Sequence, residues 1–299
     1  MEEKKSLLPP LFINSFAIKI IALVLMTIDH VLAAITNFGD LSPRNDIVLI
    51  IRGICRIAYP LFCFMIFQGV IHTKKFSNYA LKLGICASAV SLGMIAVEYL
   101  PLFEGFTIRN EGIVFLDLLL GALAVYCLRH KKIYVKLLAF LPLAYSIIST
   151  FASGLECAVC GSEIWFIPFF MRTQYDFYGV LMMILIYFGY ELSKYILSKY
   201  NGAYDDTKVG QFILNIGMIF GIVVAGLLYY FFQINQMDWF DLYLETIPDI
   251  QLIALFAVVI ILFYNNRPGF NKVWFRHGCY LYYIVHLIII YVVFMIIYS

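Results

Sequence analysis

Runs of about twenty apolar residues recur along this 299-residue chain, and they restrict its fold more than any other feature. A helix rises about 1.5 Å per residue, so about 20 apolar residues span the hydrocarbon core of a bilayer. The chain is 63% hydrophobic and 13% charged, whereas soluble domains are about a quarter charged. We therefore expect an integral membrane protein, an all-α polytopic bundle in a lipid bilayer.

The apolar runs predict about nine transmembrane helices. Strands of a membrane barrel would alternate in hydrophobicity over about ten residues, and these runs do not alternate. No polar linker divides the chain, so residues 1–299 are expected to form a single transmembrane helical domain. The first run is too long for a signal peptide and lacks a small-residue cleavage site, so we expect it to be retained. The expected spans are about 16–37, 47–71, 79–100, 112–129, 133–152, 175–196, 211–233, 248–264 and 278–298.

Lys and Arg residues predict the orientation, because cytoplasmic loops carry an excess of both. Alternate span ends hold only Arg44, Arg109 and Arg172, and the remaining ends hold most of the other basic residues. The N-terminus is therefore expected inside and the C-terminus outside. A net charge of +2 is too small to indicate a nucleic-acid partner.

Seven cysteines do not indicate a disulfide scaffold in this chain. Cys157 and Cys160 form a CxxC motif in an expected outer loop, as a disulfide or as two free thiols. That loop contains no histidine, so no metal site is expected there. The other five fall within spans and are expected to act as small packing residues: Cys55, Cys63, Cys86, Cys127 and Cys279.

Ionisable residues inside the spans mark the candidate site. Each costs about 2.5–3.5 kcal/mol on insertion scales, and such residues usually face the bundle interior. Asp29 and His30 are neighbours in "LVLMTIDHVLAA", so they point about 100° apart and cannot simply pair. Arg52 and Arg56 are four residues apart and share one helix face. Asp29 and Asp117 lie at a matching depth, so we expect a neutralised network of two arginines and two aspartates.

His30 is the expected proton carrier beside this network. It lies roughly 20 Å from the cytoplasmic end of its span, and His286 lies roughly 12 Å from that end of the last span. Histidine is the side chain best suited to proton transfer near neutral pH. The alternative is that the charged network only holds the helices together.

The cytoplasmic turn "QGVIHTKKFSNY" offers a possible site for a phosphorylated donor. His72, Thr73, Lys74 and Lys75 could bind phosphate groups, since Lys is a common phosphate partner. The alternative is that these charges only set the topology.

Four stretches, in chain order, resemble the TraX family of bacterial membrane proteins, named for an F-pilin acetylation protein. "IKIIALVLMTIDHVLAAI" (18–35) is similar to the family's Met-x-x-Asp-His helix. "IRGICRIAYPLFCFMIFQGVIHTKKFSNYALKL" (51–83) is similar to its Gly-Arg-x-Ala-x-Pro-x-Phe motif followed by Gly-x-x-His-Thr. "QYDFYGVLMMILIYF" (174–188) and "LFYNNRPGFNKVWFRHGCYLYYIVHLIII" (262–290) resemble its Tyr-Gly helix and its closing helix. The chain departs from the pattern at Cys55, Ile284 and Val285.

The resemblance implies a multi-pass protein of the bacterial cytoplasmic membrane that N-acetylates pilin, akin to transmembrane acyltransferases using cytosolic acyl-CoA. Asp29, His30, Arg56, His72 and His286 carry over as candidate residues. We expect transfer of an acetyl or other acyl group from acetyl-CoA or another acyl-CoA to an extracytoplasmic pilin N-terminus, peptide or glycan. A proton-coupled or small-molecule transporter and a non-enzymatic pilus or secretion assembly protein are the alternatives.

Overall fold

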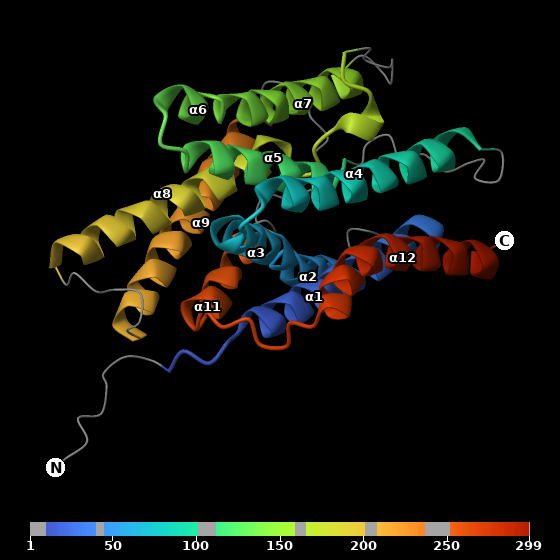
Figure 1. The fold of residues 1–299 in the computed structure, drawn as a ribbon. Coiled ribbons are helices and arrows are strands. Elements are labelled where there is room, and N and C mark those ends of the chain that lie inside the picture. The colour runs from blue at the N-terminus through green and yellow to red at the C-terminus, as the bar shows by residue number, and fades with distance from the viewer. Residues whose placement is uncertain are drawn as a thin grey trace.

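The computed structural model describes residues 10–39, 45–100, 112–158, 166–200, 208–236 and 252–298. Over these residues the backbone is helical, and the one β-bridge is an isolated pair between Ile13 and Tyr264. Figure 1 shows long helices packed side by side, with α12 and α1 on one side and α6 and α7 on the other. The all-α membrane bundle expected from the apolar runs is confirmed.

The helices of the described residues include both short and long elements. The first half holds α1 (Ser15–Phe38), α2 (Asp46–Cys55), α3 (Ala58–His72), α4 (Phe76–Tyr99), α5 (Val114–Leu128), α6 (Ile133–Leu137) and α7 (Phe140–Ala158). The second half holds η2 (Phe169–Met171), α8 (Asp176–Tyr200), α9 (Lys208–Gln236), η3 (Ala254–Phe256), α11 (Ala257–Leu262) and α12 (Val273–Tyr298).

Seven helical segments of the described residues are long and apolar enough to cross a membrane. Two of the expected nine fall short of this length. The span expected at 112–129 is α5, which has 15 residues, and the span expected at 248–264 contains only the short η3 and α11 in its described part. The expected count of nine is therefore approximate, and the inside–outside orientation stays a prediction from the charges.

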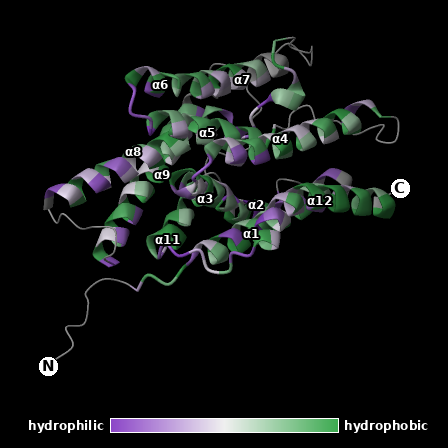
Figure 2. Cartoon of the chain, viewed as in Figure 1, coloured by the Kyte–Doolittle hydropathy of each residue, from purple (hydrophilic) through white to green (hydrophobic). Residues whose placement is uncertain are grey.

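Exposed side chains on the long helices are mostly apolar. Figure 2 shows hydrophobic residues along the helix shafts and hydrophilic residues at the far ends of α8 and α9. Leu92 of α4 is 66% exposed and Ile296 of α12 is 71% exposed. Apolar exposure on this scale is unusual for a soluble monomer, whereas lipid contact accommodates it.

Helices α8 and α9 approach closely because three glycines meet at their interface. A Cβ atom built on Gly189 would lie 1.9 Å from the carbonyl oxygen of Gly217, and one on Gly221 would lie 2.3 Å from that of Leu185. Small residues allow such backbone approach between membrane helices, where van der Waals packing drives association. Of this pair, α8 also packs against α3 and α5, whereas α9 packs against α11.

One expected span, 47–71, is broken near its middle. Residues Arg56 and Ile57 form a turn between α2 and α3, and Ile57 N–H bonds to the carbonyl of Ile54, three residues back, at 3.2 Å. Pro60 explains the break, because its ring clashes with the carbonyl four residues earlier, which is that of Arg56. The proline thus places Arg56 at a turn inside the bundle.

Candidate functional site

Six segments of the fold border a small cavity of about 40 Å³, called the His30 cavity below. A water needs about 10–15 Å³ of such space, so the cavity accommodates a few waters or a group of a few heavy atoms. Its walls come from α1, α2, α3, α5, α12 and the residue before α8, and are formed by Met26, Asp29, His30, Cys55, Ala58, Tyr59, Phe62, Val114, Tyr175 and Tyr283.

Two histidines meet at the edge of this cavity. His30 Nδ1 lies 2.9 Å from His286 Nε2, and His286 Nδ1 lies 2.8 Å from the carbonyl oxygen of Tyr282. A carbonyl only accepts, so His286 Nδ1 carries a proton, and in the neutral ring its Nε2 has a lone pair. His30 Nδ1–H therefore donates to that lone pair, which leaves Nε2 of neutral His30 unprotonated and able to accept a proton.

The two histidines lie at one level because α1 and α12 run side by side in the same direction. Thr27 Oγ1 and the Tyr282 hydroxyl are 2.7 Å apart one turn before the histidines. At about 1.5 Å per residue, His30 lies about 22 Å from the start of α1 and His286 about 20 Å from the start of α12. The sequence placed His286 lower, because its span was expected to begin at 278 whereas α12 begins at Val273.

Aromatic rings hold His286 in place. Its ring stacks on Tyr282 with centroids 5.1 Å apart and planes at 5°, and Tyr283 meets it edge-on at 5.6 Å. The residue is only 5% exposed. A buried ring fixed on two sides and by a carbonyl is suited to orient the histidine that it contacts.

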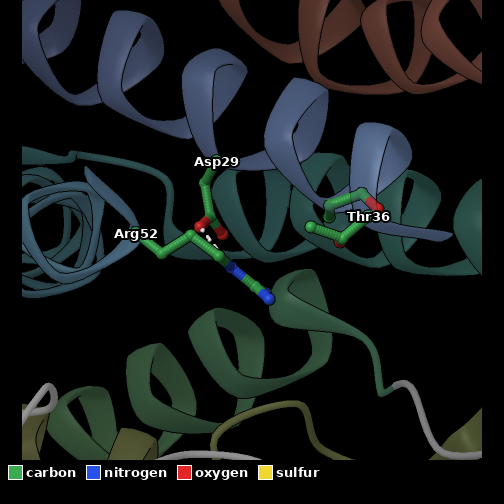
Figure 3. Close-up of polar contacts among 4 residues, drawn as sticks. Asp29, Thr36 and Arg52 are labelled. Atoms are coloured by element: carbon green, nitrogen blue, oxygen red, sulfur yellow. Dashed lines mark hydrogen bonds and ion pairs between the residues drawn. The ribbon is translucent and has the colours of Figure 1, made fainter. Parts of the chain in front are cut away.

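Asp29 pairs with Arg52, as the sequence predicted for an arginine of the second span. Arg52 Nε lies 3.3 Å from Asp29 Oδ1, and the two side chains are 28% and 19% exposed. Figure 3 shows the Arg52 side chain extending past Asp29, with Thr36 further along α1. Thr36 donates to the carbonyl of Ala33 at 2.9 Å instead. Asp29 is thus the ion-pair partner of Arg52, and His286 orients the His30 ring.

Arg56 contacts a different partner at the start of α8. Its guanidinium donates to the hydroxyl of Tyr175, a residue that lines the His30 cavity. The Tyr175 ring stacks on Tyr59, with centroids 3.5 Å apart and planes at 17°. Arg56 therefore reaches the cavity wall through Tyr175.

Asp117 is fully buried and accepts backbone hydrogen bonds at the start of α8. Its Oδ2 lies 2.8 Å from the N–H nitrogen of Gln174 and 3.3 Å from that of Tyr175. The sequence predicted that Asp117 joins a network with the arginines. In the structure its carboxylate instead binds backbone N–H groups before α8. Because it binds the Tyr175 amide, Asp117 positions a residue of the cavity wall.

The expected donor site at the other end of α3 borders a second cavity, called the basic cavity below. Its volume is about 290 Å³, and it is lined by Val70, Thr73, Lys74, Phe76, Tyr126, Arg129 and His130. Two of the four residues expected there, Thr73 and Lys74, line it. His72 Nδ1 instead contacts the carbonyl of Gln68 at 2.9 Å, and Lys75 is the exposed residue before α4.

Arg129 and His130 were not expected from the sequence as neighbours of this turn. They lie at the end of α5, and the charges of 129–132 were interpreted as topology signals alone. The same charges placed the 73–75 turn and the α5–α6 turn on one side of the membrane. Their expected location on the same side was the signal in the sequence that these two turns could meet.

The Cys157 side chain and Cys160 lie outside the described residues, so the expected CxxC motif stays a prediction.

The chain resembles known proteins over much of its length. A family model described as TraX protein matches residues 15–201, a range that contains every candidate site residue except His286. A probable fimbrial assembly protein FimC, serogroup H1, of Dichelobacter nodosus is 28% identical over 136 residues, which are 44% of this chain and 53% of that protein. The match thus spans about half the length of that relative. No solved structure matches the chain.

Proposed function

The chain belongs to the TraX family, and from this premise we propose that it is a membrane-embedded acyltransferase. It moves an acetyl or other short acyl group from cytosolic acyl-CoA to an extracytoplasmic amine or hydroxyl, and it resides in the bacterial cytoplasmic membrane. The supporting observation is the pair of His30 and His286 beside a cavity inside the bundle. That pair leaves one histidine nitrogen available as a base where hydrocarbon would otherwise be expected.

His30 acts as the general base in this proposal. As the acceptor nitrogen or oxygen attacks the thioester carbonyl, His30 Nε2 removes the acceptor's proton. The new C–N or C–O bond forms, the C–S bond breaks, and the departing thiolate takes the proton from His30. Proton transfer of this kind contributes typically 10²–10⁴-fold to a rate.

Arg56 and Tyr175 are better placed than Arg52 to stabilise the oxyanion that develops on the thioester carbonyl. Arg52 is already paired with Asp29, whereas Tyr175 lines the cavity and carries the Arg56 contact. Donors aimed at a charge that develops only in the transition state contribute strongly to catalysis. Asp117, through the Tyr175 amide, keeps this wall in position.

The acceptor is proposed from the family and from the similar fimbrial assembly protein. A pilin N-terminus is an amine, and a surface glycan offers hydroxyls, so either suits the chemistry of His30. The name of the relative also favours a second candidate function. In that alternative, the chain takes part in assembling a pilus without transferring any group.

Reconstituted protein separates these two functions. Proteoliposomes holding the full chain receive labelled acetyl-CoA on one side and a peptide with the N-terminus of a pilin on the other. The acyltransferase proposal predicts label on the peptide, and none with empty vesicles. The non-enzymatic alternative predicts a different pair of results. Pilus assembly would depend on the folded protein, and no label would appear on peptide or glycan acceptors.

A further inference from the structure

The basic cavity is built where two hairpin turns meet at one end of the bundle. The α3–α4 turn supplies Thr73 and Lys74, and the end of α5 supplies Arg129 and His130. Arg129 joins the turns directly, because its guanidinium donates to the carbonyls of Val70 and, at 3.3 Å, Ile71 at the end of α3. The two turns therefore form one structural unit.

The lining of this cavity is positively charged. Among the described residues that line it, three are basic and none is acidic. Two Arg129 nitrogens are held by α3 carbonyls, and an arginine has five N–H donors in a fixed plane, so further donors remain for a ligand. His130 Nδ1 accepts from the backbone N–H of Lys132 at 3.2 Å. In neutral His130 the proton is therefore on Nε2, which can donate to an anion.

The start of α4 adds to the attraction for an anion. Thr73, Lys74 and Phe76 border the cavity where this 24-residue helix begins. The side chain of its N-cap residue, Lys75, makes no capping hydrogen bond, and its first turn holds no acidic residue. The unpaired N–H groups and the helix dipole favour a negative group at such a helix start.

One wall of the cavity is aromatic. The rings of Phe76 and Tyr126 stack with centroids 4.0 Å apart and planes at 5°. Ligand pockets typically measure about 300–1,000 Å³, and this cavity of about 290 Å³ lies at the lower end. An apolar wall beside the cations suits an organic phosphate ester better than a bare phosphate ion.

The basic cavity and the His30 cavity share two helices. On α3, Phe62 lines the His30 cavity and Val70 lines the basic cavity, about 12 Å away along the helix axis. On α5, Val114 and Tyr126 line the same two cavities about 18 Å apart. Between these positions the two helices carry buried side chains, among them Phe67 of α3 and Leu118 of α5. A ligand held by its phosphates at one cavity would need α3 and α5 to separate before its far end reached His30.

We propose that the basic cavity binds the phosphate groups of the acyl donor, with Lys74, Arg129 and His130 as the phosphate-contacting residues. The inference rests on the proposed acyltransferase function, and it replaces His72 and Lys75 of the expected set with Arg129 and His130. A phosphate ester could also reach this cavity as a lipid headgroup. The experiment below separates the two sources.

The test measures coenzyme A binding to the full chain in phosphatidylcholine nanodiscs by calorimetry. Coenzyme A carries no acyl group, so the measurement is independent of transfer. Lys74→Gln and the conservative Arg129→Lys are expected to weaken binding at least tenfold, because each removes charge-assisted contacts to phosphate. The control Lys131→Gln removes a charge from the α5–α6 turn, next to His130, but Lys131 does not line the cavity. This variant should bind coenzyme A as wild type does. Pantetheine, which lacks phosphate, should not bind.

Two results would overturn the inference. Equal coenzyme A affinity in wild type, Lys74→Gln and Lys131→Gln would remove the cavity as the binding site. The second result has two parts: coenzyme A does not bind, and phosphatidylglycerol in the nanodisc raises the unfolding temperature only when Lys74 is present. This result would assign the cavity to a lipid headgroup. A failure of the proposed acyltransferase function would give a different result from these two. Coenzyme A would then bind in a Lys74-dependent way, but no acyl transfer would follow.

Discussion

Replacing His286 by alanine tests whether it acts through His30. The variant removes the 2.9 Å hydrogen bond that holds the His30 ring and its tautomer. One such bond contributes about 0.5–1.5 kcal/mol net, and about 1.36 kcal/mol corresponds to tenfold in rate. We therefore expect transfer to fall about 2- to 13-fold in His286→Ala, against about 10²–10⁴-fold in His30→Ala.

The double variant gives the sharper result. A residue that works only through another adds no further loss once that other is removed. The variant carrying both His30→Ala and His286→Ala should therefore transfer at the rate of His30→Ala alone. His286→Gln should recover part of the rate, since an amide oxygen can accept from His30 Nδ1–H. The assay is single-turnover acetyl transfer in proteoliposomes, with folding checked by circular dichroism and unfolding temperature.

An additive loss would refute this account. If the double variant is slower than His30→Ala by the full factor seen in His286→Ala, then His286 acts on the substrate independently. A large fall in unfolding temperature for His286→Ala, with no recovery in His286→Gln, would give it a structural role.

Three further variants test the architecture around the site. Asp29→Asn leaves the Arg52 cation uncompensated inside the bundle, so the free energy of unfolding should fall by about 1–3 kcal/mol, measured by denaturant titration in detergent; an unchanged value would mean that the pair is not structural. Gly189→Leu should abolish the close approach to Gly217, visible as loss of monodisperse folded protein in size-exclusion chromatography, and a folded variant would contradict the backbone contact. Pro60→Ala should let α2 and α3 join into one helix, with slower transfer and slightly higher helicity by circular dichroism; unchanged transfer would show that the turn does not position the site.

Features that depend on one helix at a time could be predicted from the sequence. Apolar length predicted the membrane bundle, and helical spacing predicted that Asp29 pairs with an arginine of the next span rather than with His30. The same reasoning overstated α5, whose 15 residues are apolar but short. Depth along a helix could also be misjudged, because α12 begins five residues before the apolar run suggested.

Features that depend on which helices meet could not be predicted in this way. His30 and His286 are 256 residues apart in sequence, and periodicity along either helix carries no information on the partner. Asp117 was assigned to the arginines because charge and depth matched, whereas the amides at the start of α8 compete for the same carboxylate. The meeting of the Lys74 turn with Arg129 likewise follows from packing rather than from local pattern.

The most direct test of the central claim is acetyl transfer by His30→Ala, with His277→Ala as the matched control. His277 lies exposed near the start of α12, away from both cavities. The protein is reconstituted with labelled acetyl-CoA and an acceptor peptide, and label on the peptide is followed over a single turnover. We predict that wild type and His277→Ala transfer at similar rates, and that folded His30→Ala is at least about 100-fold slower. Transfer by His30→Ala at the wild-type rate would contradict the assignment of His30 as the general base.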